Sequence, residues 1–340
     1  MTTRTEEVRS LVFHAILRGD YGPGDLIPTE REMASTTGTS RVTVRRAYAE
    51  LESSGILQRR QGSGTRIASS APASGRRGST IAVLASLRDP FALEFIEALE
   101  RALAAQEAFL LVKLTDQDPE RERAAAIALA EHGVRDLIVW ASGGGYDRAL
   151  FRRLRILGTN LVFFDRMEPD GFADYVGLDN RHAMSAILGH ATDRGAARAL
   201  LVTHSGLNAD SDRQREEAFG AACERLGLPH RSVSVVWGKD IGEQVAANAA
   251  AWFAAGPALA AVGVNDEIAA HLKRAAPGQS VYGIDGLPHA LASGVISYRQ
   301  PIAKMAERAV ELLLTQQRLG SSWRPTQVRM RGKLVGPHAA

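Results

Sequence analysis

Two sets of side chains in this sequence have the types and the spacing to bind other molecules. The first set lies in the segment Ser40–Arg46, which reads Ser-Arg-Val-Thr-Val-Arg-Arg. On a helix, Arg41 and Arg45 are one turn apart, and Thr43 between them is short. A helix that enters the major groove of DNA needs short polar or cationic residues in its first turns, and arginine pairs bidentately with guanine. This set therefore predicts a helix that reads DNA.

The second set follows short apolar runs in the rest of the chain. Asp165, Asn265 and Asp285 each stand where such a run has just ended. In open α/β sheets, ligands bind in the crevice outside the carboxyl ends of the strands, so these side chains should line one crevice. Together with Arg215 and Gln300 they supply carboxylates, amides and a cation that bind adjacent hydroxyl groups. The second set predicts a site for a polyol such as a sugar.

An aromatic face would complete such a site, because a sugar ring also presents C–H surface. Phe91 and Trp237, the latter directly after the apolar run 233–236, are the candidates. Simpler interpretations exist beside these. Arg215 could be a surface charge of a helix, Trp237 could pack between lobes, and Asp266 is expected to cap a helix.

The residues before position 69 have the element order of a winged helix-turn-helix. Apolar residues recur at helical spacing in three segments, and the turn Gln61-Gly-Ser-Gly64 joins two short strands after them. The second helix begins at a capping box, Thr29-Glu-Arg-Glu32, which places Arg31 in its first turn, within reach of a phosphate. The predicted helices span about 6–18, 29–38 and 40–54, and the predicted strands span 57–60 and 65–68.

The remainder of the chain alternates between apolar strands and helices. A run of small residues over 69–79 cannot build a core and is predicted to be a linker. The eight apolar runs after it are too many for one five- or six-stranded sheet, so two α/β lobes with parallel sheets are expected, with an eight-fold barrel as the competing fold. The expected division is a winged helix-turn-helix domain over 1–68 and an effector and dimerisation domain over 80–340, with lobe 1 about 80–178 and 302–323 and lobe 2 about 179–298 and 324–336.

Charge and composition favour a cytoplasmic protein that meets a polyanion. Residues 1–80 hold 12 arginines, no lysine and 8 acidic residues, whereas the rest holds 29 basic and 30 acidic residues. The excess positive charge is therefore at one end. The single cysteine, Cys223, excludes an intrachain disulfide and a Cys-rich zinc site, and no apolar stretch is typical of a membrane helix or a signal peptide.

The first part of the chain resembles the DNA-binding domain of GntR-type bacterial transcription regulators. The resemblance covers residues 5–68 and rests on the sequences P-T-E-R-E at 28–32, S-R-V-T-V-R at 40–45, L-x-x-x-G-I-L at 51–57 and Q-G-S-G-T at 61–65. It implies a dimer that binds a palindromic site in double-stranded DNA. The residues that it implies at the operator are Arg31, Arg41, Thr43 and Arg45, with Gln61 and Gly62 at the wing tip in the minor groove.

The larger part resembles the sugar-sensing domain of LacI-type repressors, itself similar to periplasmic sugar-binding proteins. The resemblance implies that Asp89 and Trp237 also face the ligand, and the pairing with a GntR-type head is similar to the arabinose-responsive AraR type of repressor. Asp89 stands where such sensors often carry asparagine, and Arg166 adds a cation, which leaves an acidic or phosphorylated sugar open. The motifs that carry the match, over about 80–335, are Asp89-Pro-Phe91, Val162-Phe-Phe-Asp165-Arg166, Tyr175-Val-Gly-Leu-Asp-Asn180, Arg215-x-x-Ala-Phe219, Val264-Asn-Asp266, Gly283-Ile-Asp285-Gly and Gln300-Pro301.

These observations predict a ligand-controlled transcription regulator, most simply a repressor, that acts as a homodimer without cofactor or metal. Gly143-Gly-Gly145 lacks the spacing of a dinucleotide site, and no nucleophile–base pair or metal-binding pattern is evident. The alternatives are a two-lobed enzyme or a solute-binding protein with an added DNA-binding head. A catalytic constellation would favour the former and an export signal the latter.

Overall fold

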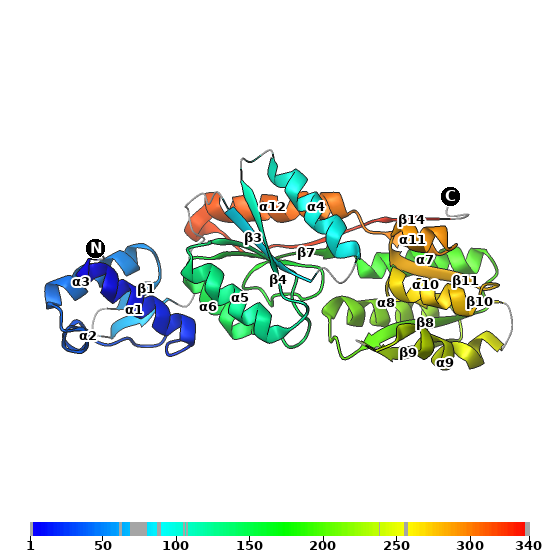
Figure 1. Ribbon diagram of the computed structural model, residues 1–340, viewed down its shortest axis with the longest axis horizontal. Helices are drawn as coiled ribbons and strands as arrows, with labels where there is room; N and C mark the ends of the chain where they lie inside the picture. Colours follow the sequence, from blue (N-terminus) through cyan, green and yellow to red (C-terminus); the bar gives the residue numbers. More distant parts are fainter. Residues whose placement is uncertain are drawn as a thin grey trace.

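The computed structural model describes residues 3–60, 63–68, 80–86, 90–104, 106, 108–237, 239–254 and 258–336. They form a small N-terminal head followed by two α/β lobes, arranged in a row (Figure 1). The expected two-lobed architecture is confirmed, and the eight-fold barrel is excluded because the strands of the two lobes form separate sheets. The predicted linker, 69–79, lies outside the described residues.

The head has the predicted element order of a winged helix-turn-helix. At the capping box, Thr29 Oγ1 accepts a hydrogen bond from the Glu32 amide, and the Glu32 carboxylate accepts one from the Thr29 amide at 2.8 Å. The apolar sides of the helices meet in a core that includes Val12, Val44 and Tyr48. The elements are α1 (Arg4–Arg18), α2 (Glu30–Thr37), α3 (Arg41–Ser53), β1 (Leu57–Arg60) and β2 (Gly64–Ile67).

Lobe 1 is a parallel sheet with the strand order β13-β7-β6-β5-β3-β4. Its central strands are apolar on both faces because helices cover both: α5 and α6 pack on one face and α4 and α12 on the other. The elements are β3 (Thr80–Ala85), α4 (Pro90–Ala104), β4 (Phe109–Leu114), α5 (Pro119–Glu131), β5 (Asp136–Val139), α6 (Arg148–Ile156), β6 (Asn160–Phe164), β7 (Asp174–Leu178), α12 (Ile302–Leu319), a 3₁₀ turn (Gly320–Ser322) and β13 (Gln327–Met330).

Lobe 2 repeats this plan with the order β14-β12-β11-β10-β8-β9, in which only the edge strand β14 is antiparallel. Helices α7 and α8 cover one face, and α9, α10 and α11 cover the other. The elements are α7 (Asn180–Asp193), β8 (Arg198–Ser205), α8 (Asp210–Leu226), β9 (His230–Val236), α9 (Ile241–Ala254), β10 (Leu259–Gly263), α10 (Asp266–Ala275), β11 (Ser280–Asp285), α11 (Pro288–Ala292), β12 (Ile296–Arg299) and β14 (Lys333–Val335).

The chain crosses between the lobes after β7, after β12 and after β13. The expected assignment of 324–336 to lobe 2 is wrong for its first half, because β13 pairs with β7 of lobe 1 and only β14 joins lobe 2. Both strands are short and partly exposed, so neither has the apolar run that would have revealed its sheet.

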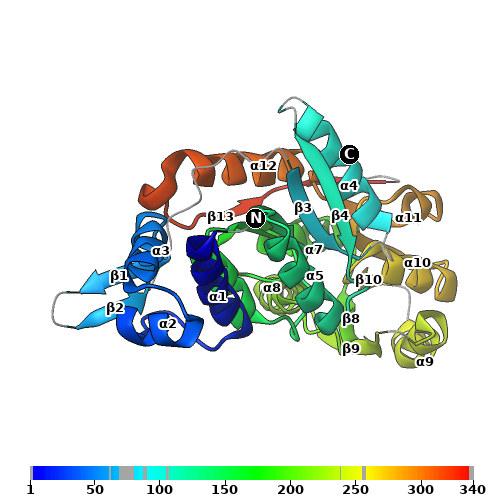
Figure 2. The same cartoon turned by 60° about the vertical axis from the view of Figure 1, so that its left-hand side comes forward.

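The head rests on lobe 1 through α1 (Figure 2). The Arg135 guanidinium lies 5.5 Å from the centre of the Phe13 ring, and His14 Nδ1 lies 3.7 Å from Glu131 Oε1. Helix α3 keeps its polar side exposed. In the described part of the chain, no helix has the length and apolar character needed to cross a bilayer.

Candidate functional site

The polar side of α3 begins at a well-formed helix cap. Ser40 accepts a hydrogen bond from the Thr43 amide at 3.1 Å, and the two hydroxyl groups lie 2.8 Å apart. Arg41 and Arg45 are exposed on the following turns, and Arg31 is exposed at the start of α2. The predicted DNA-contacting side chains of these helices therefore share one accessible region of the head.

The cations of this region differ in how they are held. Glu30 bridges two of them, since its carboxylate lies 3.1 Å from Arg45 Nε and 3.0 Å from Arg59 Nη2. Within the described residues, Arg31 and Arg41 have no carboxylate oxygen within 4 Å. Both are available to a phosphate or a base edge. The predicted wing-tip residues Gln61 and Gly62 lie outside the described residues.

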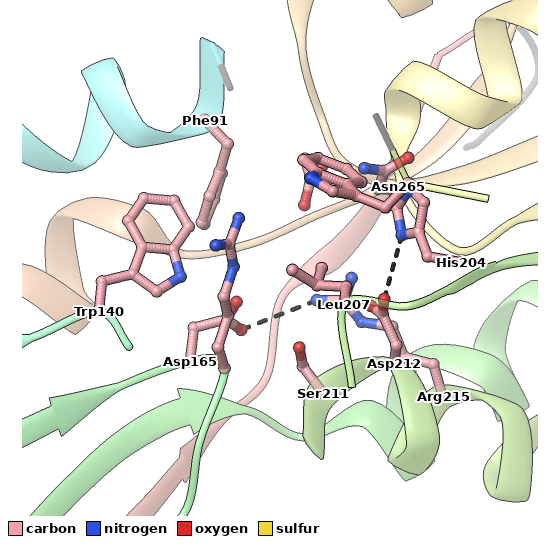
Figure 3. A pocket seen from close by; sticks show the side chains of 12 residues that line it. Phe91, Trp140, Asp165, His204, Leu207, Ser211, Asp212, Arg215 and Asn265 are labelled. Atoms are coloured by element: carbon pink, nitrogen blue, oxygen red, sulfur yellow. Dashed lines mark hydrogen bonds and ion pairs between the residues drawn. The ribbon is translucent and has the colours of Figure 1, made fainter. Parts of the chain in front are cut away.

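A pocket lies between the two lobes, at the carboxyl ends of their strands (Figure 3). In Figure 3, Phe91 and Trp140 of lobe 1 lie across the pocket from His204 and Asn265 of lobe 2. The pocket brings together six of the predicted effector residues, which come from six separate segments. Its lining residues are Phe91, Trp140, Asp165, Arg166, His204, Leu207, Ser211, Asp212, Arg215, Trp237, Asn265 and Asp285.

The remaining two predicted effector residues, Gln300 and Asp89, are not among the described lining residues of the pocket. Gln300 supports the pocket from behind, because its Nε2 donates to Asp285 Oδ1 at 2.8 Å. Asp89 lies outside the described residues.

The two pocket carboxylates that follow strands have unusual backbone conformations. Asp165, after β6, has φ of 56°, and Asp285, at the end of β11, has φ of 133°. Residues other than glycine rarely adopt positive φ angles, although asparagine and aspartate do so more often than the rest, and the φ of Asp285 lies outside the left-handed helical region. Such conformations persist where the surroundings hold them, often at functional sites. The Tyr175 hydroxyl donates to the Asp165 carbonyl at 2.8 Å and helps to hold the turn.

Arg215 organises the lobe 2 side of the pocket from α8. Its side chain is only 4% exposed, which excludes the alternative of a surface charge. Nε donates to Asn180 Oδ1 and Nη1 donates to the Val264 carbonyl, both at 2.9 Å, while Nη2 lies 3.7 Å from Asp165 Oδ1 across the lobe boundary. Burial alone would lower the pKa of this guanidinium, but the surrounding carboxylates outweigh burial and raise it.

Asn265 has a double role. It is the N-cap of α10, because its Oδ1 accepts from the Ile268 amide at 3.0 Å, and its Nδ2 remains to face a ligand. The expectation that Asp266 caps this helix is wrong. Asp266 is fully buried and accepts hydrogen bonds from the Gly286 and Leu287 amides and from the Ser297 hydroxyl, which fixes the turn that carries Asp285.

Several lining residues were not predicted as ligand contacts. His204 Nδ1 lies 3.0 Å from Asp212 Oδ2, and the His204 ring meets the Trp237 ring edge-on at 4.8 Å. Burial alone would raise the pKa of Asp212, but the hydrogen bond with His204 and the charges of His204, Arg215 and Arg166 together outweigh burial, and the pKa is lowered. Trp140 and His204 stand at the ends of β5 and β8, so the strand-end rule applied to every strand would have found them.

The two lobes touch at one side of the pocket through the Gly143-Gly-Gly145 segment. The Gly144 amide donates to the Leu207 carbonyl at 3.3 Å, and a Cβ atom on Gly143 would overlap that same carbonyl oxygen. Beside it, the Arg166 carbonyl accepts from the Asp210 amide at the start of α8, at 2.8 Å. These contacts join lobe 1 to lobe 2 at this side of the pocket.

Comparison with known families agrees with both halves. Residues 4–67 match the bacterial regulatory proteins of the gntR family. Residues 77–300, more than half of the chain, match the periplasmic binding proteins and sugar binding domain of the LacI family. The chain belongs to the LacI-type family of sugar-binding domains. Its head is a gntR-type helix-turn-helix, as the resemblance implied.

The curated relatives of this LacI-type chain are described as transcription factors. It is 34% identical over 155 residues to the HTH-type transcriptional regulator PtxS of Pseudomonas aeruginosa, covering 44% of each chain. It is 29% identical over 134 residues to the arabinose metabolism transcriptional repressor of Geobacillus stearothermophilus, covering 39% of this chain and 37% of that protein. The chain thus matches less than half the length of these relatives.

Among solved structures, the lac repressor dimer bound to operator and the anti-inducer ONPF is similar in fold. The TM-score is 0.65 at 17% identity, over 78% of this chain and 95% of that one.

Proposed function

We propose that this chain is a transcription regulator whose operator binding is controlled by a small sugar-like effector in the cleft between the lobes. The observation that carries the proposal is the convergence of Asp165, Arg215, Asn265 and Asp285 on one buried pocket, in a chain that also has an exposed cationic reading helix. The descriptions of the curated relatives support it.

The head would bind a palindromic operator in double-stranded DNA. Arg41 and Arg45 enter the major groove with α3, where Arg41 is free to pair with a base and Arg45 exchanges Glu30 for the DNA. Arg31 and the amino end of α2 bind a phosphate and set the register of the helix. Ser40 and Thr43 are short enough to let the helix approach the base edges.

The cleft would bind the effector and hold the lobes closed. Hydroxyl groups of a sugar bridge Asp165 of lobe 1 to Asn265 and Asp285 of lobe 2, while Phe91 and Trp237 cover the C–H surface of its ring. Closure that moves lobe 1 also moves the head that rests on it, and in a repressor this would weaken operator binding. A coupling of about 1–3 kcal/mol is sufficient for such control.

A homodimer would present two heads to the two halves of the palindrome. Lobe 1 has an exposed apolar edge on β4 and α4 that a second copy could cover: Phe109 is 74% exposed, and Leu93, Leu111 and Leu114 are exposed beside it. An unpaired apolar edge strand of this kind favours association. A regulator that binds operator DNA would act in the cytoplasm.

The regulator hypothesis is tested with full-length protein and operator DNA selected from random duplexes. We expect footprinting to show a palindromic site and expect one member of a carbohydrate panel to lower operator affinity by about 5–150-fold. Selection that yields no preferred sequence would contradict the DNA-binding assignment. Operator binding that no carbohydrate alters would contradict the sugar assignment and leave the DNA-binding assignment in place.

A further inference from the structure

Arg166 is a cation of the pocket that makes no direct ion pair with a carboxylate of the described residues, although its charge acts on the nearby carboxylates of Asp212 and Glu122. The residue is 6% exposed and lines the cavity, and its guanidinium lies 4.9 Å from the centre of the Trp140 ring. Among the described residues, no carboxylate oxygen lies within 4 Å of it. The guanidinium therefore stacks on the Trp140 ring, and its N–H groups make no hydrogen bond to the described residues.

The other cationic groups of the pocket differ in this respect. Arg215 has Asp165 and two hydrogen-bond acceptors, and His204 has Asp212. A buried guanidinium without a directly hydrogen-bonded anion is unfavourable, and stacking on an indole ring offsets only part of the desolvation. A site that keeps such a group next to a cavity is prepared for an anion that arrives with the ligand.

The remaining charges of the pocket limit how much negative charge the ligand can carry. Three carboxylates, Asp165, Asp212 and Asp285, line the same cavity as the two arginines. A phosphate monoester with a charge near −2 would face these carboxylates with a single unpaired cation to hold it. A carboxylate has one negative charge and matches the planar guanidinium fork in a bidentate pair.

We propose that the effector is a sugar acid, with its carboxylate bound by Arg166 and its hydroxyl groups bound by the carboxylates and amides opposite. This inference rests on the proposed effector function of the cleft and names the ligand class.

The test is isothermal titration calorimetry of the full chain with matched probes. Each set contains a neutral aldose, its aldonate, its uronate and its 6-phosphate, starting with the glucose and galactose series. We expect one of the acids to bind at least about tenfold more tightly than its neutral parent, the range for a hydrogen bond to a charged group. The affinity of that acid should also exceed that of the corresponding phosphate.

Two variants connect this preference to Arg166. In Arg166→Gln, we expect the ratio between the affinities of the acid and its neutral parent to fall toward one. Arg166→Lys keeps the charge but not the fork, so we expect an intermediate ratio. Circular dichroism is used to check that each variant is folded. If Arg166→Gln does not fold, the ratio measured for Arg166→Lys is compared with that of the unsubstituted protein.

The possible outcomes separate this inference from the function on which it rests. A neutral sugar or a sugar phosphate that binds more tightly than every acid would overturn the sugar-acid assignment, as would an unchanged ratio in both Arg166 variants. If Asp285→Asn then removed the binding of that other ligand, the effector function of the cleft would stand. Failure of every probe to bind would overturn both.

Discussion

The head and the cleft both present arginine side chains, but those of the head are exposed and those of the cleft are buried. In the head, Arg31 and Arg41 are exposed, and no carboxylate of the described residues lies within 4 Å of either. In the cleft, Arg215 is buried with two hydrogen bonds and a carboxylate beside it. An exposed cation interacts with a polyanion through a screened field, whereas a buried one selects a ligand by geometry at short range. The exposed arginines are therefore suited to bind DNA with high affinity, and the buried ones are suited to select a small molecule.

The largest expected difference between the two regions is in the salt dependence of their binding affinities. Counterion release makes operator binding fall by about 10³-fold or more between 50 and 200 mM salt if the dimer makes six or more phosphate contacts. Effector affinity should change by only about threefold over the same range, because buried groups are screened much less. Fluorescence anisotropy with labelled operator and calorimetry with the effector measure the two slopes. Equal slopes would contradict the comparison.

Removing the head's reading arginines should abolish specific operator binding. In the double variant Arg41→Ala and Arg45→Ala, we expect operator affinity to fall by about 100-fold or more, since each bidentate base contact is worth about 1–3 kcal/mol. Effector binding should remain. The matched control is Arg121→Ala with Arg308→Ala, two helix arginines of lobe 1. A protected operator in footprinting with the double variant would show that another helix reads the DNA.

Removing a cleft carboxylate should have the converse effect. In Asp285→Asn, we expect effector affinity to fall by about 10- to 100-fold, because hydrogen bonds to a charged group contribute about 1.5–3 kcal/mol. Operator binding without effector should remain. Asp193→Asn, at the end of α7 and away from the pocket lining, is the control. Normal release of the operator by the effector in Asp285→Asn would place the ligand site elsewhere.

A substitution that disturbs the contact between the lobes should lower effector affinity, although the substituted residue does not line the pocket. A Cβ on Gly143 would overlap the Leu207 carbonyl, so Gly143→Ala should lower effector affinity by about tenfold, equal to about 1.4 kcal/mol of lost closure. Gly171→Ala is a matched control, because Gly171 also has a positive φ but a Cβ there meets nothing within 4 Å. Equal affinities in the two variants would mean that backbone strain, and not the contact between the lobes, causes the loss.

Much of the fold could be predicted because local signals and packing agree. Each of the eight apolar runs after the linker forms a strand, and the Thr29–Glu32 capping box begins α2. The strands β13 and β14 escaped prediction because they are short and partly exposed, and β7 and β12 escaped it because polar or small residues interrupt their apolar residues.

The site was predictable where a single strand end carries the polar group, as at Asp165 and Asp285. It was not where two segments create the function together. The strand-end rule can find the position of His204 but not its pairing with Asp212 on the next helix, and Gly143-Gly-Gly145 gains its role from Leu207 of the other lobe. The residues around His204 and around the glycine segment carry no signal for Asp212 or Leu207, so residue spacing alone could not reveal these contacts.

The central claim is that occupation of the cleft changes the affinity of the head for DNA, and reciprocal linkage tests it most directly. The operator Kd would be measured with and without a saturating concentration of the panel member that binds most tightly, and the Kd of that ligand with and without operator. The account predicts that both change by the same factor, about 5–150-fold, as thermodynamic coupling requires. A factor of one in both experiments would show that the cleft and the head act independently.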